Sequence, residues 1–239
     1  LITGSRYQDD VKHLEVRGDK KKSIPLTIGD EINFAFDPER SCIGYRQAEG
    51  ASGSLLSCPN KVSGISSSQC PDCLGSAKIL PCLRCTGEVC RNQVKRPSCV
   101  QPDNHALYLA GFASGVIKVG VSRWPRRHQR LLEQGARTAI ILARDDGQMI
   151  RRYETQITSF GFVDRLSSAE KLSYLSQNIS VDKLLEEITE AYEKIRLRMR
   201  APWLDEIETV SLPDYPVIQG LESASLWKPK DNPGRAIIK

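Results

Sequence analysis

Apolar and polar positions alternate along the first 47 residues of the chain. The apolar positions of this pattern are Leu14, Val16, Ile24, Leu26, Ile28, Ile32, Phe34 and Phe36. A period of two is typical of strands with one buried face, and the dipeptides Gly18-Asp19 and Gly29-Asp30 favour turns. Residues 1–47 are therefore predicted to form a small antiparallel β region.

The next segment, residues 48–104, has almost no apolar periodicity. Ser, Gly, Pro and Cys dominate it, and such a long stretch without regular structure is unusual in a folded protein. A bound metal ion can supply the folding free energy that a hydrophobic core would otherwise provide. We expect this segment to be organised by metal rather than by apolar packing.

Strong periodicity returns between residues 105 and 165. The pattern predicts strands over Ala106–Ala110, Val116–Val121 and Thr138–Ala143, and helices from Pro125 to Gly135 and over Gln148–Phe160. Proline favours the first helical turn and glycine favours the C-terminal cap, which sets both ends of the first helix. The predicted order of elements in this core is β-β-α-β-α.

Residues 166–211 are predicted to be helical, and residues 212–239 to form strand and turn. The clearest helix covers Val181–Arg198, and its apolar stripe contains Leu184, Leu185, Ile188, Ala191, Tyr192 and Ile195. A stripe of this kind packs against a core. The fold class predicted for the whole chain is α+β. A membrane partner is not expected, because no run of about 18 apolar residues occurs.

All eight cysteines fall in one part of the chain, at Cys42, Cys58, Cys70, Cys73, Cys82, Cys85, Cys90 and Cys99. Two pairs have the C-x-x-C spacing that is typical of thiolate ligands on tetrahedral zinc. Eight thiols suit one or two structural Zn²⁺ ions. The ligand pairing stays open, with His105 as an alternative ligand. No secretory signal is recognised, so a cytoplasmic location is expected rather than a disulfide scaffold.

Positive charge is concentrated in the predicted core. The formal net charge is only +5, yet basic residues outnumber acidic ones three to one between positions 118 and 152. The basic residues are Lys118, Arg123, Arg126, Arg127, Arg130, Arg137, Arg144, Arg151 and Arg152, and the acidic ones are Glu133, Asp145 and Asp146. Such a region attracts polyanions. A nucleic-acid partner is expected, with an ordinary solvated surface as the alternative.

The first predicted helix of the core carries much of this charge. Rotation by 100° per residue places Trp124, His128, Leu131 and Leu132 on one buried face. Four arginines fall on the adjoining flank, namely Arg123, Arg126, Arg127 and Arg130. Arg127 lies nearest the buried face, where a planar guanidinium can hold two phosphate oxygens.

Two short motifs resemble those of the GIY-YIG nuclease family. They are Ala106-Leu107-Tyr108 and Lys118-Val119-Gly120, followed in the family's order by an arginine-rich helix and a helix with Glu154. With the upstream cysteines and Glu133-Gln134-Gly135-Ala136, the pattern is also similar to a family of uncharacterised prokaryotic zinc-cysteine proteins that share this core. The resemblance covers residues 105–160 and implies a GIY-YIG-like β-β-α-β-α core.

The resemblance also implies roles for single residues. Glu154 would hold one catalytic divalent cation, Mg²⁺ or Mn²⁺, Arg127 would stabilise charge on the phosphorane, and Tyr108 would position or deprotonate the attacking water. Arg130 and His105 are further catalytic candidates. The remaining arginines, Arg123 and Arg126, and Gln134 are candidates for substrate binding. The alternatives are a core aromatic for Tyr108 and a surface ion pair with Arg151 or Arg152 for Glu154.

Lys118 departs from the family, which has tyrosine at this position. Its ammonium can bind an anion or, when desolvated, act as a base, but it cannot replace a phenol. We expect Lys118 and Tyr108 to rise from a shallow floor of small residues that a substrate can approach.

Three functions remain open at this point. The leading hypothesis is metal-dependent phosphodiester hydrolysis on DNA or RNA. The second is a non-catalytic, zinc-dependent nucleic-acid-binding protein, and the third is a non-nuclease enzyme acting on a small anionic or amino-acid substrate. The oligomeric state does not follow from the sequence.

Overall fold

The structure is a computed structural model of the 239-residue chain, and it divides into two compact units. Unit 1 contains residues 1–80 and 226–239, and unit 2 contains residues 81–225. The described residues are 2–8, 11–17, 20–27, 32–34, 39–46, 55–76, 82, 85–91, 95–175, 177, 179–201, 207–212 and 236–238.

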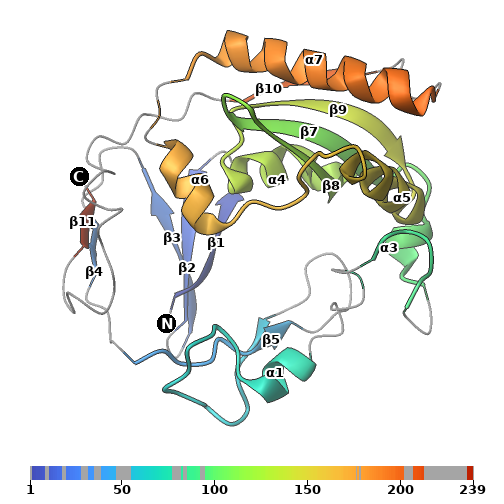
Figure 1. Cartoon of the computed structure of the whole chain (residues 1–239). Helices are drawn as coiled ribbons and strands as arrows, with labels where there is room; N and C mark the ends of the chain where they lie inside the picture. The colour runs from blue at the N-terminus through green and yellow to red at the C-terminus, as the bar shows by residue number, and fades with distance from the viewer. Residues whose placement is uncertain are drawn as a thin grey trace. The chain divides into compact units, whose positions relative to one another are not determined.

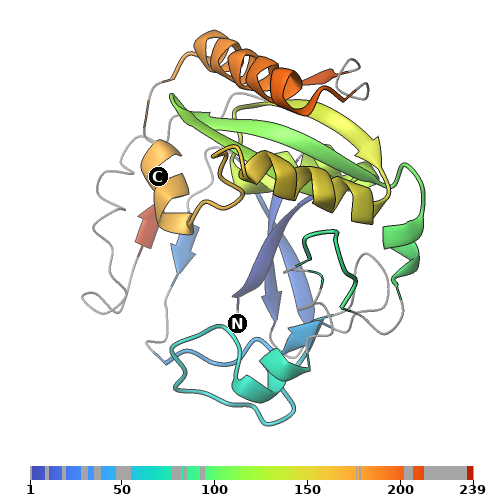
Figure 2. The ribbon, with the colours of Figure 1, turned by 45° about the vertical axis from the view of Figure 1, so that its right-hand side comes forward.

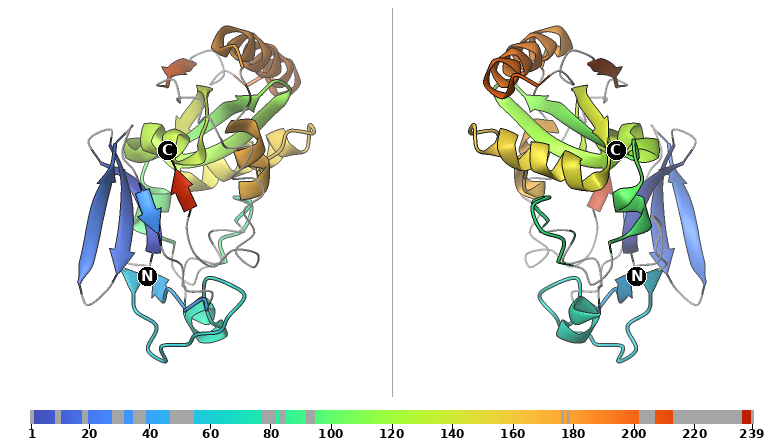
Figure 3. Two further views of the ribbon diagram at one scale, coloured as in Figure 1. Left: turned by 90° about the vertical axis from the view of Figure 1, so that its left-hand side faces the viewer. Right: turned by 90° about the vertical axis from the view of Figure 1, so that its right-hand side faces the viewer.

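Unit 1 begins with the antiparallel sheet that the alternating pattern predicts. Its strands are β1 (Ile2–Gln8), β2 (Val11–Arg17) and β3 (Lys21–Leu26), in the order β1-β2-β3. The three lie side by side in both views of Figure 3. This part of the prediction is confirmed, whereas the expected turns at residues 18–19 and 29–30 lie outside the described residues.

Two shorter pairs of strands complete the described sheets of unit 1. Strand β4 (Ile32–Phe34) pairs with β11 (Ala236–Ile238) from the far end of the chain, and β5 (Tyr45–Arg46) pairs with β6 (Leu55–Leu56). Residues 213–235 and 239, which include most of the predicted C-terminal strand and turn segment, lie outside the described residues.

Unit 2 is built around a four-stranded antiparallel sheet. Its strands are β7 (His105–Ala113), β8 (Val116–Arg123), β9 (Thr138–Asp145) and β10 (Glu208–Ser211), in the order β10-β9-β7-β8 (Figure 1). The first three were predicted, and β10 was not. Residues 166–211, predicted to be helical, therefore end in a strand that pairs with β9.

The helices of unit 2 follow the predicted order. They are α3 (Pro97–Val100), the 3₁₀ turn η1 (Trp124–Arg126), α4 (Arg127–Gln134), α5 (Gly147–Thr158), α6 (Ser168–Leu175) and α7 (Val181–Met199). The β-β-α-β-α order is thus confirmed. Gly135 caps α4 with a positive φ of 76°, as expected for glycine at this position. Asp146 begins α5 because its carboxylate accepts the amides of Gln148 and Met149.

Alternate residues of the strands feed two apolar clusters on opposite faces of the unit 2 sheet. One face buries Leu107 and Leu109 against Ile150 of α5 and Ile188 of α7, and α5 and α7 run along the sheet in Figure 2. The other face buries Ala106, Tyr108 and Ala110 against Leu131 of α4. Because successive residues of a strand point to opposite faces of the sheet, this alternation decides which of the candidate site residues share a face.

The helix after β8 buries a different set of side chains from the set that its sequence predicts. His128 was placed on the buried face, but its side chain is 54% exposed and its Nε2 lies 3.6 Å from Glu208. The first three residues form a 3₁₀ turn, with a different rotation per residue from that of an α-helix. Leu131 and Gln134 consequently form the buried face of α4.

Helix α7 buries the stripe that its sequence predicts, with Leu184, Ile188, Ala191, Tyr192 and Ile195 turned inward. Ser180 caps its start by accepting the amide of Lys183. None of the described helices combines the length and the apolar character that crossing a bilayer requires.

Candidate metal centre and candidate active site

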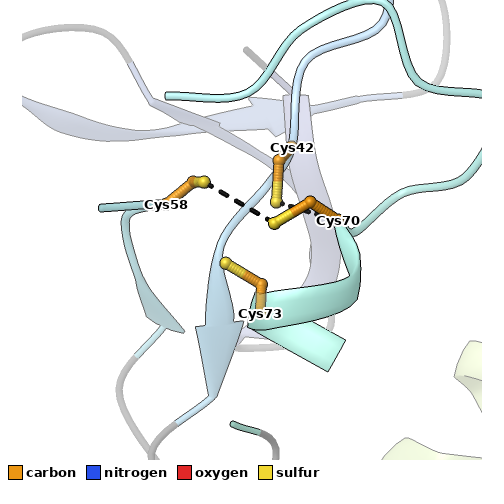
Figure 4. Close-up of side chains that lie close together, drawn as sticks. All are labelled: Cys42, Cys58, Cys70 and Cys73. Atoms are coloured by element: carbon orange, nitrogen blue, oxygen red, sulfur yellow. Dashed lines mark hydrogen bonds between the residues drawn. The ribbon is translucent and has the colours of Figure 1, made fainter. Parts of the chain in front are cut away.

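Four of the cysteines meet in unit 1. Cys42, Cys58, Cys70 and Cys73 are all buried, and their sulfur atoms all lie within 4.8 Å of one another (Figure 4). Thiolates at about 2.3 Å from a tetrahedral zinc lie about 3.8 Å apart, and the sulfurs of Cys58 and Cys70 are 3.9 Å apart. The cluster can therefore hold a metal ion such as zinc.

Local backbone geometry aims these sulfurs at one point. Gly44 has a φ of 88°, and its amide donates to the sulfur of Cys42 at 3.4 Å. The amide of Cys70 donates to the same sulfur at 3.2 Å. Cys70 is the N-cap of α1 (Pro71–Gly75), so Pro71 starts the helix and Cys73 follows within its first turn. Amide donors of this kind stabilise a sulfur that carries negative charge.

The thiols of the cluster influence one another's protonation. A backbone hydrogen bond from Val62 lowers the pKa of Cys58 to about 7 against the opposing effect of burial, and a second one from Asn60 adds to the shift. Burial raises the pKa of Cys73 far above its usual range, and hydrogen bonds to the neighbouring cysteines raise it further. Four such thiols without a cation are costly to ionise together, and a metal ion would remove that cost by taking up their charge.

The eight predicted ligands thus separate into two sets of four. The first set is the cluster of Cys42, Cys58, Cys70 and Cys73 in unit 1. The second set, Cys82, Cys85, Cys90 and Cys99, belongs to unit 2 and is half-buried. None of the eight cysteines forms a disulfide. Among the described residues, only the first set brings at least three possible metal-binding side chains within 4.8 Å of one another.

Three polar side chains, those of Tyr108, Gln134 and Lys118, are joined by hydrogen bonds where α4 meets the sheet of unit 2, and they form a polar chain. Gln134 donates through Nε2 to the hydroxyl oxygen of Tyr108 at 2.6 Å, and its Oε1 accepts from Nζ of Lys118 at 2.6 Å. Because ammonium can only donate, Lys118 fixes which end of the Gln134 amide points to the phenol. The sequence singled out all three residues, and the structure brings them together.

The expectation of a shallow floor open to substrate is wrong for Tyr108. Its side chain is only 1% exposed, because it crosses to β8 and lies over Gly120. A Cβ added at Gly120 would stand 2.6 Å from the Tyr108 hydroxyl and 2.7 Å from ring carbon Cζ. The glycine of the Lys118-Val119-Gly120 motif is therefore required by the tyrosine of the first motif.

This contact predicts the effect of Gly120→Ala. The added methyl group forces the Tyr108 ring away from β8, which weakens its hydrogen bond to Gln134. We expect a loss of about 1–3 kcal/mol in the free energy of unfolding, as for other overpacked cores, measured by urea denaturation. Gly75→Ala is the control, since nothing lies within 4 Å of a Cβ there. Equal stabilities of Gly120→Ala and wild type would contradict the contact.

Burial shifts the pKa of both ends of this polar chain. Desolvation lowers the pKa of Lys118 to about 8, and the nearby charges of Lys171 and Arg130 add to the effect. Desolvation also raises the pKa of Tyr108, against the opposing influence of its hydrogen bond from Gln134. Lys118 therefore carries an ammonium that releases its proton more easily than a surface lysine, beside a phenol that stays neutral.

Glu154 stands on α5 as a nearly buried carboxyl group. Its Oε2 accepts from Nη1 of Arg151 at 2.7 Å, the ion pair that was the alternative interpretation of this residue. Burial nevertheless raises the pKa of Glu154, more than Arg151 lowers it, and Asp164 raises it and Lys118 lowers it through their charges. Glu154 is thus within electrostatic reach of the polar chain.

The predicted arginines separate into two groups. The positive charge of Arg130 lowers the pKa of Tyr108, of Lys118 and of Lys171. Arg127 instead stacks on Trp124, with its guanidinium carbon 3.8 Å from the ring centroid, and lies 3.5 Å from a carboxylate oxygen of Glu208. The arginine that reaches the polar chain is Arg130, one helical turn beyond Arg127.

The other candidates lie around the site at different places. Arg126 pairs with Glu133 at 3.0 Å. Arg123 lies opposite His105 across β7 and β8. Burial lowers the pKa of His105 to about 4, and the charges of Arg123 and Arg151 lower it further. His105 shares the α5 face with Leu107, whereas Tyr108 faces α4.

Two residues near the site, Asp164 and Lys171, were not singled out from the sequence. Asp164 follows Val163, which forms a parallel bridge with Lys118 along the free edge of β8. The amide of Val119 donates to the carbonyl of Val163 at 2.9 Å. No periodicity marks this bridge, so only the tertiary fold reveals that a carboxylate stands beside Lys118.

Much of the basic stretch has intramolecular partners. Glu133 pairs with Arg126 and Arg130, Glu208 with Arg127, and Glu154 with Arg151. Arg137 donates to the carbonyls of Tyr174 and Gln177, and Arg152 donates to that of Gly87. Positive charge in this region therefore also supports the fold, and the charge left for a ligand is smaller than the sequence suggests.

A cavity of about 540 Å³ lies beside the β8 edge. Its lining includes the apolar side chains of Ile117 and Val163 and four charged residues, namely Glu170, Glu187, Glu190 and Lys194. A largely apolar cavity with three carboxylates and one ammonium does not favour an anion.

The fold and the cysteine cluster define an α+β protein with a tetrathiolate site that can hold a metal ion. Residues 29–234 match the family described as Protein of unknown function (DUF2797), and the chain belongs to this family. No curated protein and no solved structure matches the chain.

Proposed function

We propose that unit 2 is a GIY-YIG-like enzyme that hydrolyses phosphodiester bonds in DNA or RNA with the help of a divalent cation. The observation that carries this proposal is that the charges of Arg130 and Glu154 both act on Tyr108 and on Lys118. These residues come from β7, β8, α4 and α5, so every element of the β-β-α-β-α core contributes except β9. In the first set of cysteines, we propose Zn²⁺ as the bound ion.

Lys118 and Arg130 supply the positive charge of the proposed site. Arg130 is half-exposed, and it can therefore meet a phosphate in solvent while its charge still acts on Lys118. Lys118 is buried, and in this environment its ammonium attracts an anion more strongly than it would in water. Transition states of phosphoryl transfer spread negative charge over several oxygens, which such a pair would stabilise.

Glu154 is the residue that would hold the divalent cation. Mg²⁺ is typically bound through one or two carboxylates, several waters and the substrate's own phosphate. One carboxylate oxygen of Glu154 pairs with Arg151, and Asp164 is the second carboxylate within electrostatic reach. A bound cation would polarise the phosphate and lower the pKa of its water. The donor set fits Mg²⁺ or Mn²⁺ held largely by substrate and water.

Tyr108 has a positioning role in this arrangement. Its hydroxyl oxygen already accepts from Gln134, and burial raises its pKa. The phenol therefore keeps its proton at neutral pH and holds Gln134, and through it Lys118, in place. Lys118 takes the position nearest to the bound anion, where the GIY-YIG family has tyrosine.

The proposal is tested with labelled single- and double-stranded DNA and RNA. Cleavage is expected with Mg²⁺ or Mn²⁺ and is expected to stop with EDTA. Arg130→Gln is expected to lower kcat/KM about 10²-fold, the usual effect of removing one donor to transition-state charge. Salt-dependent binding without turnover under any metal would replace this proposal by the non-catalytic nucleic-acid-binding protein.

Arg126→Gln is the matched comparison for Arg130→Gln. Arg126 is the N-cap of α4 and Arg130 belongs to this helix. Both pair with Glu133, and their side-chain exposures are similar at 46% and 48%. Of these two arginines, only Arg130 carries a charge that shifts the pKa of Lys118 and of Tyr108. A much smaller loss is expected for Arg126→Gln, through a weaker general field. Equal losses in the two variants would show that the arginines act only as surface charge.

A second candidate function is hydrolysis or binding of a small anionic substrate by the same residues. The observation that favours it is the burial of Tyr108 and Lys118, which suits a compact ligand better than a duplex. A small chromogenic phosphodiester tested beside the polymers separates the two. Turnover of the small ester together with intact DNA and RNA would select this second function.

A further inference from the structure

Two parts of the segment that carries the second set of cysteines contact α5 in unit 2. The loop after Cys85 lies directly on this helix: Gly87 accepts through its carbonyl from Gln148 at 2.9 Å and from Arg152 at 3.0 Å. The hydroxyl of Thr155 donates to the carbonyl of Thr86 at 3.1 Å. A Cβ at Gly87 would stand 2.5 Å from backbone atoms of α5. The loop is thus seated against the helix backbone.

The turn at Cys85 repeats a turn of the first set. In Cys85-Thr86-Gly87 the glycine has a φ of 85°, and its amide donates to the Cys85 sulfur at 3.4 Å. In Cys42-Ile43-Gly44 the corresponding φ is 88° and the corresponding distance is also 3.4 Å. The two turns thus share a left-handed glycine and the same amide-to-sulfur contact.

Cys99 repeats a second local feature of the first set. It is the third residue of the short helix α3, which begins at Pro97. Cys73 is likewise the third residue of α1, which begins at Pro71. Both sulfurs therefore project from the first turn of a helix started by proline. Each set thus contains one cysteine followed by a glycine turn and one in a proline-started helical turn.

The start of α5 brings Cys99 and His105 close together. The Cys99 sulfur and Nδ1 of His105 each lie 3.1 Å from the Cβ position of Gly147, the first residue of α5. The buried Nδ1 of His105 has no hydrogen-bond partner in the structure. The amide of Cys85 donates to the carbonyl of Cys82 at 3.4 Å, so these two cysteines share one tight turn next to the Gly87 contact with α5.

We infer that Cys82, Cys85, Cys90 and Cys99 form a second tetrathiolate zinc site, which fastens the 82–99 segment to the start of α5 and to β7. The four sulfurs are less tightly gathered than those of the first set. Zinc–thiolate binding releases roughly 10 kcal/mol or more of apparent free energy, which is ample to draw them together. His105 packs beside the Cys99 ligand and excludes water from it.

The position of this site gives it a structural consequence. Helix α5 carries Glu154, and strand β7, which begins at His105, carries Tyr108. Loss of the ion frees the loop that holds Gln148, Arg152 and Thr155 of α5. Occupancy of the second site therefore stabilises α5 locally, whether or not the core is a phosphodiesterase.

The test measures zinc per chain in the purified full chain by inductively coupled plasma mass spectrometry. Wild type is expected to hold two ions, Cys99→Ser one, Cys73→Ser one, and the double variant none. Amide hydrogen exchange of residues 147–158 is expected to accelerate in Cys99→Ser but not in Cys73→Ser. Val100→Ser is the control, because Val100 is the exposed neighbour of Cys99 in α3.

A second measurement covers the case in which Cys99→Ser fails to fold. Titration of wild-type protein with a mercurial reagent is expected to release two zinc ions as eight thiols react, about one ion for every four thiols. A single bound ion that Cys73→Ser abolishes and Cys99→Ser leaves in place would overturn the inference. Release of all zinc after only four thiols have reacted would overturn it as well.

Discussion

Replacing Cys73 with serine is expected to remove the metal ion of unit 1 and to unfold the segment around it. Cys73 is 1% exposed, and its sulfur is one of four within 4.8 Å of one another. Apart from its four cysteines, the apolar neighbours in contact with this small cluster are Tyr45, Val62 and Ile65. So few apolar contacts cannot replace the roughly 10 kcal/mol or more that a structural zinc contributes.

Zinc content and limited proteolysis measure this effect together. Cys73→Ser is expected to lose one zinc per chain and to become rapidly cleaved between residues 39 and 76. Chelation of wild-type zinc is expected to give the same cleavage pattern. Leu74→Ser is the control, since Leu74 follows Cys73 in α1 but is 48% exposed. Unchanged zinc content and protease resistance in Cys73→Ser would refute a metal-dependent fold here.

The sequence was most informative where burial imposes a strict period. The strands β7, β8 and β9 and the helices α5 and α7 agree with their predicted positions to within a few residues. The two helices each place one apolar stripe in a core cluster, and β7 and β9 place residues in both clusters. Strand β10 was missed because only four residues pair with β9, and a segment that short has no reliable periodicity.

The candidate site was predictable in its residues but not in its connections. The C-x-x-C spacing identified Cys70 and Cys73 as partners. Cys42 joins them only because two chain segments 28 residues apart meet in the fold. Similarly, nothing in the sequence joins Lys118 to Gln134, because that contact depends on how α4 crosses β8. Tertiary contacts of this kind follow from packing, which a single sequence does not display.

The choice between Arg127 and Arg130 shows how a small local change alters a site. A regular helix from Pro125 places Arg127 at the edge of the buried face. The 3₁₀ turn through Arg126 shifts that phase, and Trp124 then takes up the Arg127 guanidinium by stacking. Arg130 remains as the arginine whose charge reaches Tyr108 and Lys118.

Glu154→Gln is expected to abolish the proposed metal-dependent turnover while leaving the fold intact. Glutamine preserves the shape of the side chain but cannot bind a divalent cation with a full negative charge. We expect kcat to fall by about 10²–10³-fold, the range seen when an electrostatic contributor to the transition state is removed. Because burial already disfavours the charged form of Glu154, removing the charge relieves desolvation and offsets part of the lost bond to Arg151.

Glu193→Gln is the matched control for this substitution. Glu193 also forms an i,i+3 pair with an arginine, Arg196, at 3.5 Å, but its side chain is 49% exposed. Both variants are measured for thermal unfolding and for turnover across a range of Mg²⁺ concentrations. Loss of turnover in Glu154→Gln alone, with similar melting temperatures, would assign the cation to Glu154. Wild-type turnover in Glu154→Gln would exclude Glu154 as the cation ligand and, with it, the carboxylate on which the proposed phosphodiester chemistry depends.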